Sequence, residues 1–466
     1  MYRFSSEIIN CLCTSLRAGA IVSIAMICSG CVPSSPDMDA KPLAAPRSRP
    51  PRLPVTPTLA SHDITNARII SGANATRVQW PAPPHASDPH SVIEVSPLQE
   101  LRWSAEYPLA KIHDIAWSPD GDVLAVGGQI HDDDKELFRS PTRLYSQDGA
   151  VIEELVTDSR VGNGQGDSIS DLEWSMDGRI LATAGGLNMS ATLFYPPGKQ
   201  KAELTQVAMS IHAVKFSPQS DYFVLVTGDR DIYLYDAECN RIDVVGPAGS
   251  SLHSVAWHPD GTMLACSDPL GVMIWELRKN PSSKGLTDTV SLVPLVRVHL
   301  ALGREQWVTT LDWNPAGTRL AVGAFGTGDV WLIDRDGTPL GTMRGHTETV
   351  WRTCFSSKGI LATTSSDATT RLWDEDGNPI AELVSATPQE DILIDVVAWS
   401  PNGDYLAVAS PNELIRIYDS HAAPLANLRG HNGIITAVSW HPHGERLASA
   451  ADDKITYLWD LPARLP

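Results

Sequence analysis

The sequence lacks the short motifs that mark common hydrolases, haem proteins and nucleotide-binding enzymes. No Gly-x-Ser-x-Gly occurs, which argues against a serine peptidase, and no Cys-x-x-Cys-His occurs, which argues against covalently bound haem. Residues 162–166 (GNGQG) are glycine-rich but lack the lysine and the following helix that a phosphate-binding loop needs. These absences give no support for catalysis.

Cysteine and positive charge are both scarce. After Cys31 only Cys239, Cys266 and Cys354 remain, and their spacing predicts neither a disulfide framework nor a zinc site. We expect these three cysteines to fill apolar positions in a sheet. With 36 Lys and Arg against 55 Asp and Glu, the net charge of -19 argues against a nucleic-acid partner bound through its phosphates.

The apolar run near the start of the chain is too short to cross a bilayer. Residues 18–28 (AGAIVSIAMIC) fall well below the roughly 20 residues of a spanning helix, so residues 1–30 are predicted to be a signal peptide. The following Ser-Gly-Cys resembles the lipobox of bacterial lipoproteins, which implies lipid attachment (palmitate or a similar acyl chain) at Cys31 and a location at the bacterial cell envelope. An ordinary cleaved signal and an uncleaved anchor remain alternatives.

A proline-rich stretch follows Cys31. Residues 32–60 have no periodic apolar face and are predicted to be extended and semi-rigid. Residues 67–70 and 76–80 could form a hairpin, but three prolines follow at once. We therefore assign the whole of residues 31–96 to a lipid-anchored linker.

The remainder of the chain is a repeat. Residues 430–460 (GHNGIITAVSWHPHGERLASAADDKITYLWD) hold three short strands separated by turns, and this unit can be laid over the sequence seven more times. The first strand usually leads into a turn such as Ser-Pro-Asp-Gly at 118–121, where Pro fixes φ and Gly accepts a positive φ. The eight first-strand aromatics are Trp117, Trp174, Phe216, Trp257, Trp313, Phe355, Trp399 and Trp440.

This unit resembles the repeat of the WD-repeat (WD40) β-propeller family, over residues 97–466. The resemblance implies an all-β fold, an eight-bladed WD40-type β-propeller, which holds a long chain in one closed body. It also implies a buried tetrad of His, hydroxyl, Asp and Trp side chains that satisfy one another and are structural rather than catalytic. Two units carry the complete tetrad: His346, Thr363, Asp367 and Trp373 in one, and His431, Ser449, Asp453 and Trp459 in the other.

The last unit is one strand short. Only six residues follow Asp460, which is too few for a turn and a fourth strand. Residues 97–104 (PLQELRWS) match residues 424–431 (PLANLRGH) at Pro, Leu, Leu and Arg. We therefore predict that residues 97–103 pair with residues 455–459 and close the eight-bladed ring, so that no sheet edge is left open there.

In the WD40 family, the loops into the first strands and the turns after the second strands share one face, where partners dock around the channel mouth. Trp307 and Trp351 are expected on this face in adjacent blades, and we interpret them as a centre for binding a protein or peptide. Burial under a neighbouring loop is the alternative for both rings. The other residues expected near the mouth include His113, His212, His253 and Asp395.

Two hypotheses for function follow. The first is a non-catalytic scaffold, tethered to the bacterial envelope by lipid, with no cofactor, no metal and no nucleic-acid partner. The second is an envelope enzyme or metal-binding propeller that uses His113, His212 and His253, although a ring usually spaces such residues too widely for metal bonds of about 2 Å. Residues 131–136 (HDDDKE), expected in a loop over 129–141, are a further weak candidate for binding Ca²⁺ if they are not simply solvated. The missing catalytic motifs favour the scaffold.

Overall fold

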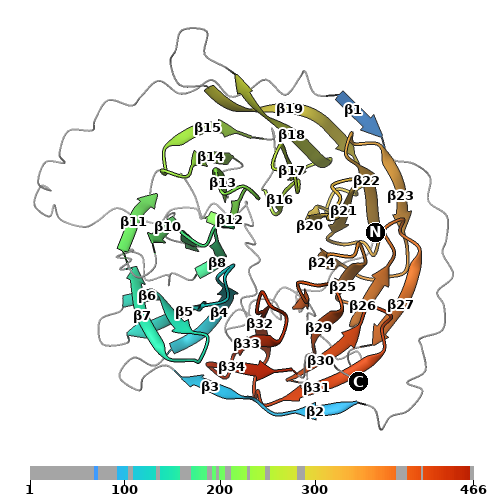
Figure 1. The fold of residues 1–466 in the computed structure, drawn as a ribbon. Helices are drawn as coiled ribbons and strands as arrows, with labels where there is room; N and C mark the ends of the chain where they lie inside the picture. Colours follow the sequence, from blue (N-terminus) through green and yellow to red (C-terminus); the bar gives the residue numbers. More distant parts are fainter. Residues whose placement is uncertain are drawn as a thin grey trace, which may run out of the picture. The chain divides into compact units, whose positions relative to one another are not determined.

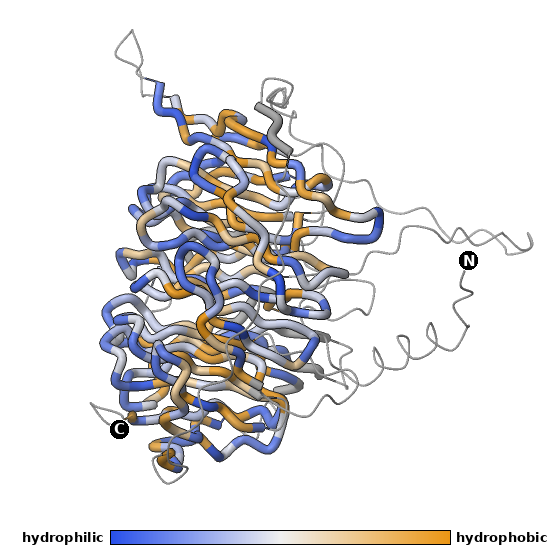
Figure 2. The backbone as a smooth tube through the Cα atoms, turned by 90° about the vertical axis from the view of Figure 1, so that its right-hand side faces the viewer, coloured by the Kyte–Doolittle hydropathy of each residue, from blue (hydrophilic) through white to orange (hydrophobic). Residues whose placement is uncertain are grey.

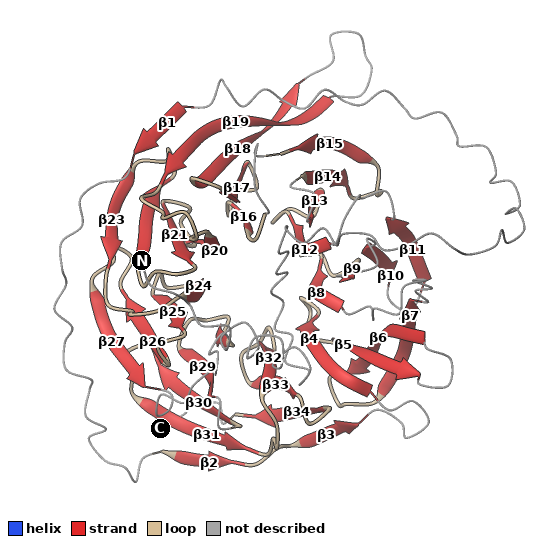
Figure 3. Ribbon diagram, turned by 180° about the vertical axis from the view of Figure 1, so that it is seen from behind, coloured by secondary structure: helices blue, strands red, loops and turns tan. Residues whose placement is uncertain are grey.

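The computed structural model describes thirteen stretches of the chain, and every regular element within them is a β-strand (Figure 3). The chain divides into two units, Met1–Ala60 and Ser61–Pro466, and all described residues belong to the second. The described residues are 68–71, 92–102, 109–132, 137–157, 169–185, 191–195, 199–204, 211–227, 231–246, 252–280, 289–384, 396–410 and 413–461.

These strands form eight sheets, the blades, in which consecutive strands pair antiparallel from the innermost strand outward (Figure 1). Short strands separated by tight turns favour this arrangement because each turn places consecutive strands side by side. Blades 1 to 4 are built from β4 (Leu109–Trp117), β5 (Val123–Asp132), β6 (Leu137–Ser146) and β7 (Val151–Thr157); β8 (Ile169–Trp174), β9 (Leu181–Gly185), β10 (Ala191–Tyr195) and β11 (Lys199–Leu204); β12 (Ile211–Phe216), β13 (Tyr222–Thr227), β14 (Ile232–Asp236) and β15 (Arg241–Val245); and β16 (Val255–Trp257), β17 (Met263–Asp268), β18 (Gly271–Asn280) and β19 (Thr289–His299).

Blades 5 to 8 repeat this order, except that the last blade takes its outer strand from the start of the domain. Blades 5 to 8 are built from β20 (Val308–Trp313), β21 (Arg319–Ala324), β22 (Val330–Asp334) and β23 (Pro339–Met343); β24 (Val350–Phe355), β25 (Leu361–Ser365), β26 (Thr369–Trp373) and β27 (Pro379–Val384); β28 (Val397–Trp399), β29 (Tyr405–Ser410), β30 (Leu414–Asp419) and β31 (Pro424–Arg429); and β32 (Ile435–Trp440), β33 (Arg446–Ala451) and β34 (Ile455–Asp460) with β3 (Gln99–Arg102). The innermost strands of neighbouring blades contact one another around the whole ring, including β32 of blade 8 against β4 of blade 1.

The closing strand confirms the predicted ring of eight blades. β3 pairs antiparallel with β34, with Gln99 opposite Leu458 and Arg102 opposite Ile455. Leu101 of β3 is buried in a cluster that also contains residues of blades 1 and 8. A second contact between the same two blades joins His441 of blade 8, through Nε2, to the carbonyl oxygen of Gly121 in blade 1, at 3.0 Å. Hydrogen bonds and apolar contacts therefore both join the ends of the ring.

Two further strands lie inside residues 31–96, which we assigned to the linker. β1 (Arg68–Ser71) pairs parallel with β19, and β2 (Ile93–Val95) pairs parallel with β31, so blades 4 and 7 each have a fifth strand. An outer strand exposes unpaired amide and carbonyl groups that any extended segment can bind, whatever its sequence pattern. Strand pairing therefore begins earlier in the chain than its composition indicates.

The recurring first-strand aromatics pack between neighbouring blades. Trp174, on the innermost strand of blade 2, donates its indole N–H to the carbonyl oxygen of Ala116 in blade 1, at 3.1 Å. Trp440 of blade 8 donates in the same way to Ala398 of blade 7, at 3.0 Å. Hydrophobic stretches recur through the whole ring, with hydrophilic stretches between them (Figure 2). One large ring per blade thus fills the space between two sheets, and four of the tryptophans also donate to a carbonyl oxygen of the preceding blade.

Candidate functional site

Each complete tetrad is assembled inside one blade. In blade 8, His431 lies 2.9 Å from Asp453 through Nδ1 and 2.7 Å from the Ser449 hydroxyl through Nε2, and Trp459 donates its indole N–H to Ser449 at 2.8 Å. In blade 6 the same contacts join His346 to Asp367 at 3.0 Å and to Thr363 at 2.8 Å, and Trp373 to Thr363 at 2.9 Å. All of these groups are turned inward, and their contacts crosslink the strands of one blade.

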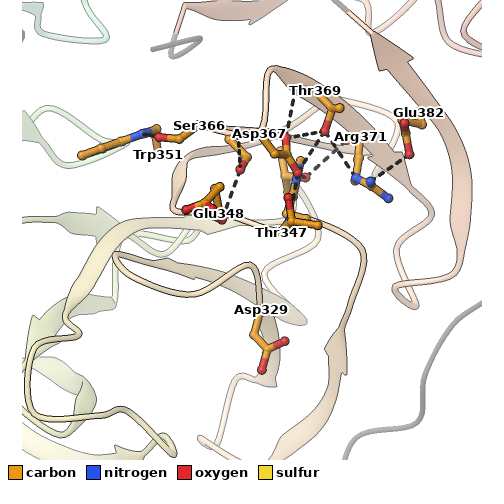
Figure 4. Close-up of polar contacts among 12 residues, drawn as sticks. Asp329, Thr347, Glu348, Trp351, Ser366, Asp367, Thr369, Arg371 and Glu382 are labelled. Atoms are coloured by element: carbon orange, nitrogen blue, oxygen red, sulfur yellow. Dashed lines mark hydrogen bonds and ion pairs between the residues drawn. The ribbon is translucent and has the colours of Figure 1, made fainter. Parts of the chain in front are cut away.

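The electrostatics of the tetrads agree with a structural role. Burial lowers the pKa of His346, so its imidazole is neutral near pH 7. Burial opposes ionisation of Asp367, but the combined interactions with His346, the Thr369 hydroxyl and the Thr347 amide outweigh this and lower the pKa of the carboxyl. Figure 4 shows that Asp367 also contacts Thr369, next to the ion pair between Arg371 and Glu382. The carboxylate thus stays charged within a set of matched partners.

Blade 4 contains a shortened version of this network that our sequence reasoning missed. Trp275 donates its indole N–H to the sulfur of Cys266 at 3.3 Å, and both side chains are buried. Cys266 occupies the strand position that Thr363 and Ser449 hold in blades 6 and 8. The signal in the sequence is a tryptophan on the third strand. In all three blades that have one there, the second strand provides a side chain that accepts from the indole N–H.

The two predicted binding tryptophans lie on one face, here called the top face, which carries the loops into the innermost strands and the turns between second and third strands. Trp307 stacks on Phe325 with ring centroids 3.9 Å apart and an interplanar angle of 10°. Phe325 in turn meets the edge of Trp351 at 6.0 Å. We call these three partly exposed side chains the aromatic row. Phe325 was missed from the sequence, although its place in the turn after β21 follows the rule that found the tryptophans.

Hydrogen bonds hold the aromatic row in place. Trp351 donates its indole N–H to the hydroxyl of Ser366 at 2.6 Å (Figure 4), and the amide of Phe325 donates to the carbonyl of Trp307 at 2.8 Å. Between the two loops, the side-chain amide of Gln306 donates to the carbonyl of Gly326 at 2.7 Å. These contacts fix the orientation of the Trp351 ring and the backbone of the two loops that carry Trp307 and Phe325.

The three predicted histidines are placed on three different blades. Burial lowers the pKa of His113 and of His253 to about 4, with Lys111 adding to the effect at His113 and His212 at His253. Burial also lowers the pKa of His212. All three are therefore neutral near pH 7, and His253 lies beside the aromatic row, 5.7 Å from the ring of Trp307.

Other predicted site residues fall partly or wholly outside the described stretches. Cys31 and Asp395 are among the residues that the structure does not describe. The first two residues of the charged run 131–136 belong to β5. This strand pairs with β6 as far as Asp132 opposite Leu137, so the strands extend into residues 129–141, which we expected to form a loop. Within the described stretches, no group of three or more His, Cys, Asp and Glu side chains is arranged to hold a metal ion.

A second polar network, also missed from the sequence, joins blades 1, 2 and 3 along their innermost strands. Asp114 accepts from the amide of Leu172 at 2.9 Å, and Asp171 accepts from the amide of Val214 at 3.0 Å. Lys215 then bridges two carboxylates of blade 2. We call Asp114, Asp171, Glu173 and Lys215 the carboxylate–lysine cluster, in which the Lys215 ammonium lies 3.0 Å from Asp171 and 2.5 Å from Glu173.

Burial gives this cluster unusual proton affinities. The pKa of Asp114 is raised to about 7 by burial and by the nearby charge of Asp171. Although burial favours loss of its proton, the Asp171 and Glu173 carboxylates raise the pKa of Lys215. On blade 5, Asp312 likewise accepts from the amide of Phe355, at 2.6 Å, and burial raises its pKa to about 7. These carboxylates connect blades, and none lies in the aromatic row.

Comparison with known proteins identifies the repeat. Residues 241–276, 337–374, 387–419 and 422–460 match the family model described as "WD domain, G-beta repeat". Actin-interacting protein 1 of Drosophila melanogaster is 23% identical over 315 residues, which cover 66% of this chain and 46% of that protein. WD repeat-containing protein 1 of Rattus norvegicus is 27% identical over 186 residues, covering 39% of this chain and 28% of that protein. The chain thus spans under half the length of these relatives.

Solved structures agree on the fold. The C-terminal WD40 domain of Sif2 superposes with a TM-score of 0.61 at 18% identity, covering 80% of this chain and 99% of that one. Chaetomium thermophilum Sqt1, bound to the N-terminus of the ribosomal protein L10, superposes with a TM-score of 0.62 at 17% identity, covering 79% and 100%. The chain therefore carries WD40 repeats, and its fold is an eight-bladed β-propeller of the WD40 type.

Proposed function

We propose that this protein is a non-catalytic scaffold that binds a protein or peptide through the aromatic row on its top face. The observation that carries the proposal is the row itself, in which Trp307, Phe325 and Trp351 remain partly exposed while a hydrogen bond orients Trp351 and stacking joins Trp307 to Phe325. Aromatic side chains of this kind supply most of the binding energy in many interfaces. Relatives with the same repeats support a binding role, since one is named for its interaction with actin.

The charged groups of the propeller support a scaffold rather than an enzyme. The tetrads and the carboxylate–lysine cluster are both engaged in contacts within or between blades. The three histidines lie on separate blades, and burial keeps them neutral near pH 7. The aromatic row, by contrast, has no structural task that requires its rings to be exposed.

Substitution of the row tests this proposal. Envelope extracts would be passed over the immobilised full-length protein, over its Trp307→Ala/Trp351→Ala variant, and over an Ile434→Ala control. Ile434 is also exposed on the top face, at 45%, but in blade 8. We expect the double variant to lose partners that both other proteins retain, with a melting temperature lowered by only a few degrees. Equal capture by all three proteins, or unfolding of the double variant, would contradict the proposal.

We further propose that a lipid on Cys31 anchors this scaffold to the bacterial cell envelope. The support is the short apolar run and the small residues before Cys31. In the described residues no helix is long and apolar enough to cross a membrane. Cys31→Ser should move the protein from the membrane fraction to the soluble fraction of lysed cells. Unchanged membrane association would rule out the anchor, and Cys239→Ser serves as a control for the loss of one thiol.

A further inference from the structure

Strand β7 forms the outer edge of blade 1 (Figure 1). In the part of the chain that the structure describes, it pairs only with β6. At seven residues, Val151–Thr157, it is the longest outermost strand of the eight sheets. One row of its amide and carbonyl groups therefore has no partner strand among the described residues, and such a row is a template for adding an extended segment.

The other uncovered outer strands of four-stranded blades carry features that discourage strand addition. β11 contains two lysines, β15 contains Arg241 and the buried Asp243, and β23 and β27 each begin with a proline, which has no N–H to donate. β7 (VIEELVT) contains neither proline nor a basic residue. Its Val151 and Ile152 side chains are 56% and 43% exposed, so the edge is apolar as well as open.

Blades 4 and 7 show how an outer edge of this propeller binds a further strand. β1 lies against β19, and β2 lies against β31. In the second pair, the carboxylate of Glu94 on β2 lies 3.0 Å from Arg429 of β31 and accepts from the side-chain amide of Asn427 at 2.8 Å. Backbone pairing and an opposite charge thus act together at an edge that already has its added strand.

The edge of β7 carries the opposite charge. Glu153 forms no ion pair within the described residues, and the next residue, Glu154, accepts from Nε of Arg143 on β6 at 3.0 Å. A second copy of β7 would bring its own carboxylates towards these, and like charges that face each other destabilise a strand pair. A segment with Lys or Arg opposite Glu153 gains an ion pair instead, as Arg429 does with Glu94.

The register of β7 sets the pattern of the segment that fits it. Leu144 of β6 lies opposite Glu153, and Tyr145 lies opposite Val151. Residues directly opposite each other share a face, and successive residues of β6 point to opposite faces, so Glu153 and Val151 lie on opposite faces of the sheet. An added strand would place basic side chains on the face of Glu153 and apolar side chains on the face of Val151.

We infer that β7 binds an extended segment of a partner protein in which Lys or Arg residues alternate with apolar, β-branched residues. Main-chain hydrogen bonds to the edge supply affinity, and the alternating side chains supply specificity. This surface lies on the outer edge of blade 1, whereas the aromatic row lies on the top face of blades 5 and 6. It is therefore a second binding surface, independent of the proposed function.

Binding of short peptides to the full-length protein tests the inference. Three fluorescein-labelled heptapeptides would be compared by fluorescence anisotropy at physiological ionic strength. The first alternates Lys and Val, the second alternates Glu and Val, and the third is the Lys–Val peptide with every backbone amide methylated. The methylated peptide keeps the charge and the side chains but cannot donate to the edge of β7. We expect the Lys–Val peptide to bind at least ten-fold more tightly than either of the others.

A charge reversal in β7 assigns the binding to this edge. Glu153→Lys should weaken the Lys–Val peptide at least ten-fold and strengthen the Glu–Val peptide, which a merely structural role of Glu153 would not produce. Glu238→Lys makes the same change of net charge in an exposed turn of blade 3 and should affect neither peptide. The Trp307→Ala/Trp351→Ala variant should bind as the wild type does. If Glu153→Lys fails to fold, Glu153→Gln replaces it, and the same weakening of the Lys–Val peptide is expected.

Three results would overturn the inference. Equal binding of the methylated and unmethylated peptides would mean that no strand is added. A preference for the Lys–Val peptide that Glu153→Lys leaves unchanged would place the binding elsewhere on the acidic surface. The third result is a wild-type dimer, detected by light scattering, that Ile152→Lys converts to a monomer, because the occupant of the edge would then be a second copy of this chain.

Discussion

Blades 6 and 8 are each crosslinked internally by a buried tetrad, whereas blades 1, 2 and 3 are connected to one another by carboxylates on their innermost strands. In blade 8, the Ser449 hydroxyl ties His431 to Trp459 within one sheet. In blades 1 to 3, Asp114 and Asp171 accept instead from amides of the next blade. The same fold thus satisfies its buried polar groups either within a sheet or between sheets.

The difference has an electrostatic consequence. In the tetrads the pKa values of Asp367 and Asp453 are lowered, so their stabilisation is present above the unfolded value of 3.8 and is lost as the pH falls towards the folded value. The pKa of His346 is also lowered, which adds destabilisation as the pH falls below its unfolded value of 6.5. Asp114, with its pKa raised to about 7, behaves in the opposite way. Ionised Asp114 destabilises the folded state above pH 7, and its protonation removes this destabilisation as the pH falls towards 3.8.

The largest effect is expected where the two regions meet. Deletion of residues 92–104 removes β2 from the outer edge of blade 7 and also β3, which exposes the edge of β34 and deprives blade 1 of its contact with buried Leu101. We expect the free energy of unfolding to fall by about 4 kcal/mol or more. Deletion of residues 32–60 is the control and should change it by less than about 1 kcal/mol. Urea denaturation would measure both, and similar losses in the two variants would show that β3 does not close the ring.

Removal of the hydroxyl at the centre of a tetrad comes next. Ser449→Ala leaves the imidazole Nε2 of His431 and the indole N–H of Trp459 buried without a partner, which should cost about 2–3 kcal/mol. The matched control is Thr183→Val at the same strand position in blade 2, where the hydroxyl reaches only the carbonyl of Thr192, at 3.4 Å. Thr183→Val should lower the free energy of unfolding by less than about 1 kcal/mol. Equal costs in chemical denaturation would mean that the tetrad adds nothing specific.

Loss of the Lys215 ammonium should lower the free energy of unfolding by a similar or smaller amount than Ser449→Ala. Lys215→Met leaves Asp171 and Glu173 without their shared partner. Because the lysine side chain is 35% exposed, water screens part of the effect, and we expect a loss of about 2 kcal/mol at pH 8. The loss should shrink as the pH falls towards 5, because burial raises the pKa of Glu173 and its protonation removes one of the two unpaired charges. Lys358→Met, which breaks a surface pair with Asp404, is the control and should cost at most about 0.5 kcal/mol.

The smallest effect is a change in pH dependence. Between pH 8 and pH 5, wild-type protein gains stability from protonation of Asp114, and the Asp114→Asn variant cannot. The difference in unfolding free energy between the two should therefore shift in favour of the wild type by about 1 kcal/mol or more at pH 5. Thermal melts at both pH values would show it, with exposed Asp148→Asn as the control. A constant difference would mean that Asp114 is already ionised at pH 5.

The features that recur along the chain could be predicted from the sequence. First-strand aromatics such as Trp440, the turn glycines and the two tetrads each follow from a pattern that repeats with the blade. The closing strand was predictable too, because residues 97–104 resemble a fourth strand without three strands before it. In each case the local pattern is sufficient, since it repeats in other blades or fills a strand position that the count of strands leaves vacant.

The features that depend on the curvature of the ring could not be predicted. Asp171, Glu173 and Lys215 alternate with apolar residues, which in a single strand indicates a solvent-facing side. Only the closed ring brings that side of β8 against β12, where the carboxylates find backbone amides. β1 and β2 were missed for a related reason, because pairing at an outer edge uses backbone groups and leaves little mark on side-chain pattern.

The pairing of β3 with β34 also sets an order of events during synthesis. Gln99 leaves the ribosome some 350 residues before Leu458, an interval of tens of seconds at about 5–20 residues per second. During that time β3 has no partner strand, and the ring of blades cannot close. Blade 8 is therefore the last to form, and the chain is most open to association with other chains just before its final residues appear.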